Sequence, residues 1–207
     1  MRKTLATLFV FGSLLAFGPA SARSEVTGFG IKAGTAMSNV FGKDVYDQKF
    51  RAGFSYGIFM TYGFGRTFAI QPELLFVMKG SKYVNGTGLE AYRETMSLEY
   101  VELPILAKVY LPLSRSFRTH VFAGPAPALN IRARVNASFA GESQQETLDN
   151  IMGVDVGLAA GAGIEVPIRG GWITFDVRYT AGLMTLSKEA DDDIRNGALS
   201  FLFGYVF

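Results

Sequence analysis

Apolar side chains alternate with small or polar ones along most of the chain. In residues 54–64 the even positions hold Phe, Tyr, Ile, Met, Tyr and Phe, whereas the odd positions hold Ser, Gly, Phe, Thr and Gly. A period of two residues is the spacing of a β-strand, in which successive side chains point to opposite faces. Seven further segments alternate in the same way, without a charge at their apolar positions. The pattern therefore predicts eight strands, within residues 29–33, 54–64, 68–78, 101–109, 121–131, 154–166, 173–183 and 199–207.

The face opposite the apolar one is unlike a solvent-exposed surface. It carries charged and amide side chains, but glycines such as Gly57, Gly124 and Gly161 dilute them. A soluble ligand-binding barrel places its large apolar residues inside and its charges outside. Small residues are instead expected where side chains crowd together, as in the lumen of a narrow barrel. We therefore predict that the polar face lines a lumen and that the apolar face contacts lipid.

The connections between these strands alternate in length. Short ones, at 65–67, 111–118 and 167–171, follow long ones, at 38–51, 80–97, 135–153 and 184–196. Membrane barrels have this alternation, with long loops on the outer side and tight turns on the periplasmic side. The sequence thus predicts an all-β fold, an eight-stranded antiparallel up-and-down transmembrane β-barrel with both ends of the mature chain in the periplasm.

The N-terminal residues have the features of a secretory signal peptide. Arg2 and Lys3 are followed by an uncharged apolar run at 4–17, and Ala20-Ser21-Ala22 supplies small residues for cleavage before Arg23. The alternative is a membrane anchor, but the run is shorter than the roughly 20 residues of a spanning helix. We predict a cleaved signal peptide at 1–22 and an outer-membrane barrel domain at 23–207.

Composition and charge narrow the function classes. Removing Arg2 and Lys3 from the 20 basic residues leaves 18, equal to the 18 acidic ones. A neutral mature chain lacks the basic footprint of a nucleic-acid binder, so we expect no nucleic-acid partner. The chain of 207 residues contains no cysteine, which excludes disulfides, thiolate zinc sites and cysteine nucleophiles.

Several segments resemble the eight-stranded outer-membrane proteins of the "porin family", common in Bacteroidetes and similar in build to the OmpX and OmpA type of barrel. The resembling residues are Gly30-Ile31-Lys32-Ala33-Gly34, 71–76, 100–108 and Phe122-Ala123-Gly124-Pro125. The resemblance covers the whole mature chain and implies an integral protein of the outer membrane, with outer-membrane lipid as its surroundings. The chain ends in alternating aromatic residues similar to the signal that the barrel-assembly machinery reads, which implies that machinery as a partner. The residues of this assembly signal are Phe203, Tyr205 and Phe207.

Three prolines fit a closed barrel less well. Pro72, Pro125 and Pro127 lie at lipid-facing positions, and each removes a backbone donor from the hydrogen-bond ladder. We expect bulges or distorted pairing at these residues.

The charges at lumen positions are nearly balanced. Six are positive and five negative: Lys32, Lys79, Lys108, Arg132, Arg134 and Arg178 against Glu73, Glu102, Asp155, Glu165 and Asp176. A charge in a narrow lumen is tolerated only when it is paired, and a balance of signs favours a filled lumen over a selective channel. We predict a central ionic network formed by Glu73, Glu102, Arg132, Asp176 and Arg178.

Catalytic and metal-binding patterns are weak. His120 is the only histidine, and the nearest serines, Ser114 and Ser116, lie in a turn, so no Ser-His-acid set is predicted. Asp191-Asp192-Asp193 with Glu189 has the oxygen ligands for a divalent cation, but a solvated acidic loop is favoured. We expect no catalytic residue, no metal and no cofactor.

The sequence therefore favours a non-enzymatic, monomeric barrel with a structural or interaction role through its long outer loops, with an unidentified extracellular or periplasmic protein as a possible partner. Two alternatives stay open. One is a narrow transporter or ligand-binding barrel, and the other is an outer-membrane lipid-modifying enzyme.

Overall fold

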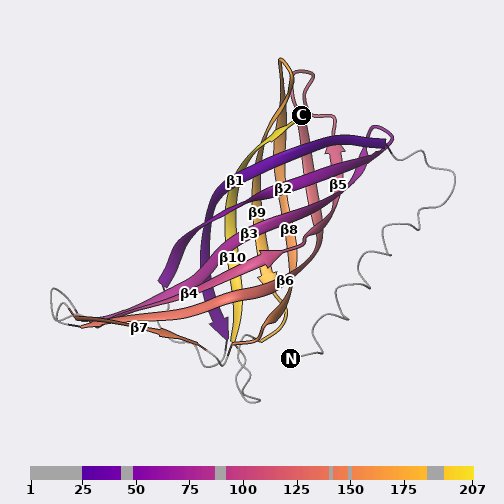
Figure 1. Cartoon of the computed structure of the whole chain (residues 1–207). Coiled ribbons are helices and arrows are strands. Elements are labelled where there is room, and N and C mark those ends of the chain that lie inside the picture. The colour runs from indigo at the N-terminus through magenta and orange to yellow at the C-terminus, as the bar shows by residue number, and fades with distance from the viewer. Residues whose placement is uncertain (1–24, 43–48, 87–91, 140–141, 149–150, 186–193) are drawn as a thin grey trace.

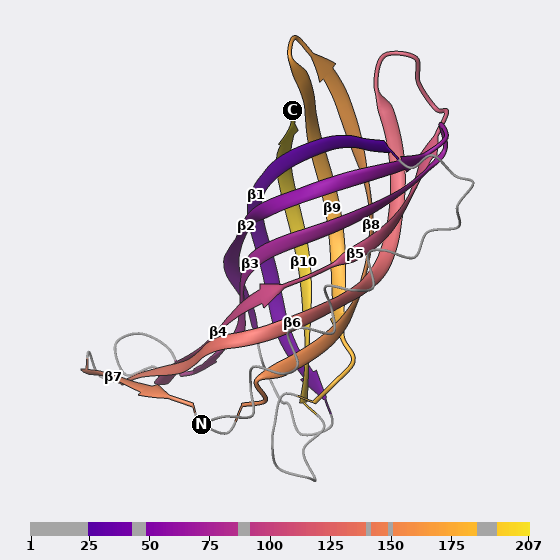
Figure 2. The same cartoon turned by 45° about the vertical axis from the view of Figure 1, so that its right-hand side comes forward.

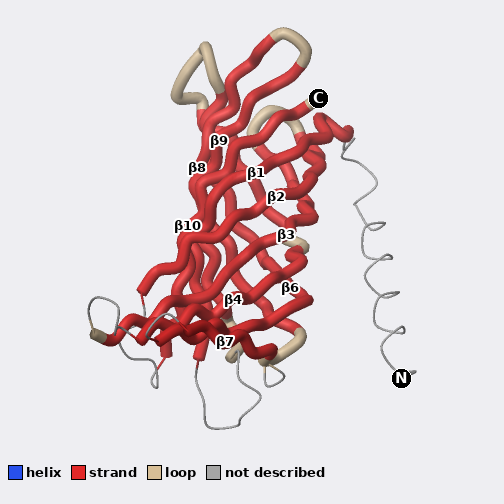
Figure 3. The backbone as a smooth tube through the Cα atoms, turned by 60° about the vertical axis from the view of Figure 1, so that its left-hand side comes forward, coloured by secondary structure: helices blue, strands red, loops and turns tan. Residues whose placement is uncertain are grey.

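The computed structural model describes residues 25–42, 49–86, 92–139, 142–148, 151–185 and 194–207. Within these ranges the regular structure is entirely antiparallel β-strand (Figure 3). The strands, shown in Figure 1, are β1 (Glu25–Gly42), β2 (Lys49–Phe64), β3 (Phe68–Asn85), β4 (Tyr92–Glu102), β5 (Ile105–Leu111), β6 (Arg118–Phe139), β7 (Glu142–Thr147), β8 (Val154–Ile168), β9 (Gly171–Gly182) and β10 (Ile194–Val206).

The sheet closes into a barrel because the first and last strands pair. β1 pairs with β10 from Gly30 opposite Val206 to Gly42 opposite Ile194, and with β2 on its other edge. The remaining order is β2, β3, β4 with β5, β6, β8, β9 and β10. β4 and β5 together occupy one position, since β3 and β6 each pair with both. The ring therefore has eight positions, as the alternation predicts.

Prolines account for the break between β4 and β5. The break lies at Leu103-Pro104, opposite Pro125 and Pro127 of β6, and the ladder between these strands is interrupted from Gly124 to Pro127. Single hydrogen bonds bridge it, including Leu103 N to Pro127 O at 2.8 Å. Pro72 interrupts the ladder from β3 to β2 in the same way. The expected distortion at these prolines is confirmed.

The strands continue far into the segments expected to be long loops. β3 and β4 pair as far as Asn85 opposite Tyr92, and β7 pairs with the end of β6. These parts form an outer extension, which we define as residues 81–85, 92–97, 133–139 and 142–147; it projects beyond the barrel wall in Figures 1 and 2. The end of β6 still alternates, with Ala133 and Val135 interleaved with Arg134 and Asn136, but β7 is wholly polar and the ends of β3 and β4 alternate irregularly. The sequence pattern therefore predicts no continuation of the sheet there.

The two faces of the wall have the predicted character. Leu158, Phe54 and Ile31 are about half exposed on the outside, whereas Phe59 and Leu75 are 2% exposed in the lumen. Glycine brings neighbouring strands close: a Cβ on Gly124 would clash with the backbone oxygen of Ile105.

Two predicted lumen positions, Arg132 and Arg134, are wrong. The pairing of β4 with β6 shifts by one residue, from Tyr100 opposite Asn130 to Glu99 opposite Arg132, so Ile131 is an extra, bulged residue. A shift of one residue exchanges the faces of everything beyond it. Arg132 consequently faces outward with its side chain 52% exposed, and Ala133 is buried in its place.

None of the described residues forms a helix of the length and apolar character that a membrane span requires.

Candidate functional site

The centre of the lumen is occupied by charged side chains from three strands. Arg178 of β9 donates to both carboxylate oxygens of Glu73 of β3, at 2.9 and 2.8 Å. Lys32 of β1 contacts the same Glu73 carboxylate at 2.8 Å and reaches Asp176 of β9 at 3.0 Å. All four residues are no more than 3% exposed. Each charge is therefore neutralised by at least one buried partner, as burial requires.

His120 belongs to this central group. Its Nε2 lies 2.9 Å from Asp176 Oδ1, and its Nδ1 lies 4.0 Å from Glu165. The ring is 1% exposed and packs near the rings of Tyr110 and Phe122. His120 is thus a buried, hydrogen-bonded residue.

An amide connects the centre to the end of the barrel where the short turns lie. Gln71 donates to Glu73 at 2.7 Å and accepts from Lys108 at 2.9 Å. Lys108 contacts Glu165 at 2.6 Å, and Glu165 also contacts Arg118 at 2.6 Å. The Arg118 guanidinium lies 3.9 Å from the centre of the Trp172 ring, a cation–π geometry.

A second polar group lies toward the opposite end. Lys79 contacts Glu102 at 2.5 Å and donates to Asn196, which donates to Asp155 at 2.6 Å. Counted together, the two groups contain five cationic residues, Lys32, Lys79, Lys108, Arg118 and Arg178, and five anionic ones, Glu73, Glu102, Asp155, Glu165 and Asp176.

Apolar side chains fill the space around these charges. Leu106, Phe122, Ala126 and Ala159 form one buried cluster. A second contains Val40, Leu98, Tyr100, Ala128 and Ala133, with Met96, Leu148, Ile151 and Ile194 packed against it. The second cluster lies where the barrel meets the outer extension, so apolar packing and ion pairs together occupy the described lumen.

The residues predicted for the central network are divided by the structure. Glu73, Asp176 and Arg178 share one group, and Glu102 belongs to the second group with Lys79. Arg132 is absent from both, because the bulge at Ile131 turns it outward to Glu99, at 3.6 Å.

The sequence prediction missed other members of the network. Lys32, Lys108 and Glu165 occupy predicted lumen positions, but alternation alone did not select them. Arg118 was assigned to a turn, although it stands directly opposite Glu165 in the β6–β8 pairing. Arg118 adjoins the short turn before β6 and Glu165 adjoins the short turn after β8, and this shared level at the short-turn end of neighbouring strands is the signal that could have found the pair.

The C-terminal aromatic residues lie on the outward face, as predicted. Phe203 and Phe207 are 61% and 63% exposed. Tyr205 donates to Gly170 O at 2.9 Å and packs edge-on against Phe207 at 4.9 Å. Their recognition by the assembly machinery stays a prediction.

Two sequence predictions fall outside the described residues: the signal peptide at 1–22 and the acidic run with Glu189 and Asp191-Asp192-Asp193. Within the described ranges, histidines and carboxylates do not gather into a group suited to a metal ion.

The chain is similar to several solved structures of outer-membrane proteins. Neisserial surface protein A is 15% identical, with 88% of this chain and 99% of that chain covered and a TM-score of 0.52. Ail, the attachment invasion locus protein of Yersinia pestis, solved with the heparin analogue sucrose octasulfate, is 16% identical, with coverage of 87% and 99% and a TM-score of 0.43. The outer membrane enzyme PagL is 10% identical, with coverage of 84% and 97% and a TM-score of 0.38.

A search of the curated proteins found no match. Residues 22–188, however, match the family described as "Outer membrane protein beta-barrel domain". Together with the closed ring and its apolar exterior, this match shows that the chain belongs to the outer membrane β-barrel domain family and is a protein of the outer membrane.

Proposed function

We propose that this protein is a non-enzymatic, non-conducting barrel that acts through its outer end, in an interaction or structural role. The observation that carries the proposal is the continuous set of ion pairs across the lumen. Glu73, Arg178 and Lys32 come from β3, β9 and β1, and their contacts join walls that are distant in sequence. An eight-stranded barrel is only wide enough for side chains to fill, and here these side chains are charged and mutually paired.

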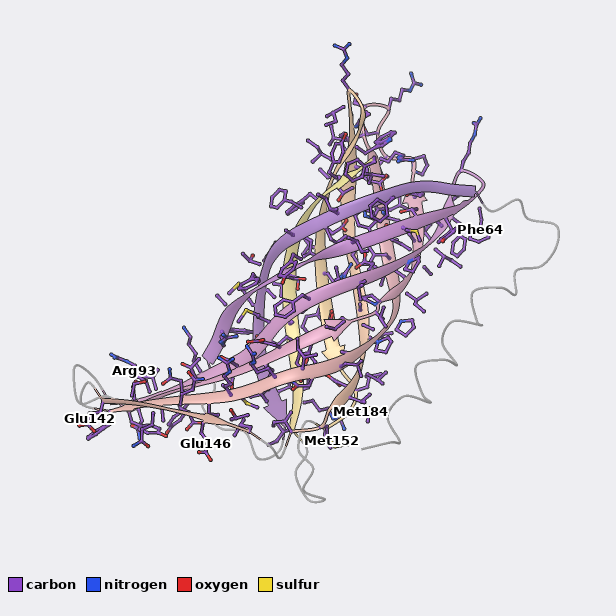
Figure 4. The ribbon with its side chains drawn as sticks, in the orientation of Figure 1. Phe64, Arg93, Glu142, Glu146, Met152 and Met184 are labelled. Atoms are coloured by element: carbon purple, nitrogen blue, oxygen red, sulfur yellow. The ribbon has the colours of Figure 1, made fainter. Side chains whose placement is uncertain are left out.

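The equal numbers of positive and negative charges in the two groups also support this proposal. A selective pore needs an excess of one sign along its path. The extra length of β3, β4, β6 and β7 gives the outer end a described surface of its own, on which Arg93, Glu142 and Glu146 lie (Figure 4).

The surroundings of His120 do not favour an enzymatic function. A catalytic triad needs a histidine that reaches both an acid and a hydroxyl nucleophile at an accessible site. The ring nitrogens of His120 face two carboxylates, Asp176 and Glu165, and the residue is 1% exposed. This arrangement suits a structural hydrogen bond.

Planar-bilayer recording combined with unfolding experiments tests the proposal. The wild-type barrel and the variants Arg178→Gln and Glu102→Gln should all give no single-channel current. Arg178→Gln should lower the free energy of unfolding by about 3–5 kcal/mol, because it leaves the buried Glu73 carboxylate with one cationic partner fewer. Glu146→Gln on the exposed β7 is the control and should change stability by less than about 0.5 kcal/mol.

A different result would favour the narrow transporter. If Arg178→Gln or Glu102→Gln folded with wild-type stability and carried an altered ion current, the charges would line a conduction path. The non-conducting barrel would then be rejected.

A further inference from the structure

A polar surface lies on the outward face, where the barrel wall continues into the outer extension, and is separate from the lumen. Strand register places three rows of side chains there, each running from β3 through β4 to β6. The rows are Met78, Glu99 and Arg132, then Gly80, Ser97 and Arg134, then Lys82, Thr95 and Asn136. A groove of about 380 Å³ runs over these rows and is also bordered by Arg51 of β2. We call it the outer groove.

The bulge at Ile131 creates this surface. Without the extra residue, Arg132 and Arg134 would point into the lumen, where the sequence alternation places them. With it, both arginines join the face that carries Lys82. The bulge therefore moves two positive charges from the interior to the outward face, where Arg134 lines the groove and Arg132 lies beside it, paired with Glu99.

The groove begins where the apolar band of the barrel ends. The next row toward the short turns is Phe76, Val101 and Leu129, which is wholly apolar and faces lipid. Two residues along a strand span about 7 Å, so charge replaces apolar surface within one row. The groove lies at the end that bears the long connections, which is the external end of such barrels. It is thus level with the headgroups of the outer leaflet.

The charges of the groove are mostly positive and only partly neutralised. Arg132 pairs with Glu99 at 3.6 Å, and Arg51 donates to the carbonyl of Lys79 at 2.9 Å. Within the part of the chain that the structure describes, Lys82 and Arg134 have no carboxylate partner. Hydroxyl and amide groups of Ser97, Thr95 and Asn136 border them.

We propose that the outer groove binds the phosphate of an outer-leaflet lipid headgroup. Arginine binds phosphate through two parallel N–H donors, and lysine adds a point charge. The hydroxyl and amide side chains match the sugar oxygens of a glycolipid headgroup, and the apolar row below the groove accepts acyl chains. A free anion would use the charges but leave this apolar row without a partner, so the contiguous surface favours a lipid.

Native mass spectrometry of the detergent-folded full barrel tests the proposal. The probe is bisphosphorylated lipid A, titrated against the wild type and against the variants Lys82→Gln and Arg134→Gln. We expect a one-to-one adduct with the wild type and about tenfold weaker binding in each variant, as the loss of one charge-assisted contact implies. Heat-dependent gel mobility reports folding, and the exposed position of Lys82 makes its variant safe for the fold.

The control is Arg169→Gln, which removes one positive charge from the exposed β8–β9 turn at the other end of the barrel. It should bind lipid A as the wild type does. Equal weakening by Arg169→Gln would mean unspecific attraction and would overturn the proposal. If the wild type bound dephosphorylated lipid A as tightly as bisphosphorylated lipid A, acyl contacts alone would suffice, which would also overturn the proposal. Displacement of lipid A by an equal concentration of inorganic phosphate would assign the groove to a soluble anion, against the lipid assignment.

Discussion

The lumen and the outer groove use the same residue types on opposite sides of one wall. Glu102 and Lys79 face inward and contact each other at 2.5 Å, both nearly inaccessible to solvent. Glu99 and Lys82 lie three residues away on the same two strands and face outward. The positive and negative charges of the lumen groups are equal in number, whereas the charges of the outer groove are mainly positive. Which face a charge occupies therefore determines whether it holds strands together or is available to a ligand.

Removing one lysine from each side of the wall should give the largest difference in stability between the two sides. Lys32→Met leaves the carboxylates of Glu73 and Asp176 short of a partner and should cost about 3–5 kcal/mol. Lys82→Met on the outer groove should change stability by less than about 0.5 kcal/mol. Urea unfolding in lipid vesicles measures both. Similar losses of unfolding free energy in the two variants would show that the lumen ion pairs do not stabilise the barrel more than the outer groove does.

A charge placed in the apolar band should have the next largest effect. Leu158 is 51% exposed on the exterior, and Leu158→Arg should destabilise the barrel by about 2–4 kcal/mol if the site lies near the bilayer midplane. Ser143→Arg on β7 of the outer extension should be nearly neutral. The same unfolding measurement compares them, and the reverse ranking would contradict the assignment of the faces.

Glycine substitutions compare the tightness of the wall with that of its outer end. A Cβ on Gly124 would clash with the backbone of Ile105, whereas one on Gly153 would meet nothing within 4 Å. Gly124→Ala should therefore cost about 1–3 kcal/mol, and Gly153→Ala should cost much less. Equal unfolding midpoints for the two variants would argue against close strand packing in the wall.

Deletion of Phe207 should have the smallest effect on stability, but it should reduce the amount of protein in the outer membrane of cells. Phe207 is 63% exposed. Its deletion should therefore lower the free energy of unfolding by less than the burial of a whole side chain contributes, which is about 1.5–3 kcal/mol. If the assembly machinery reads this residue, the outer-membrane level of the deletion variant should fall sharply while folding in detergent is retained. Quantitative blotting of membrane fractions provides the measurement. Wild-type levels would reject the assembly signal.

Alternation along the sequence determined much of the fold. It identified the ring of eight positions, the apolar exterior and most inward-facing charges, including Glu73, Asp176 and Arg178. It could do so because successive side chains of a strand point to opposite faces, so a strand between two different environments alternates in residue type. It did not reveal the outer extension, because β7 is wholly polar and the ends of β3 and β4 lack a regular apolar alternation.

The partners of each lumen charge, and the point at which the alternation changes face, depend on how the strands pair in three dimensions. The bulge at Ile131 exists in the pairing of β4 with β6, and the contact of Arg178 with Glu73 joins residues 105 positions apart. No local pattern encodes either feature, because register is a property of two strands. Alternation within a strand therefore fixed the faces of the wall, whereas pairing between strands fixed the network in the lumen and the charges of the outer groove.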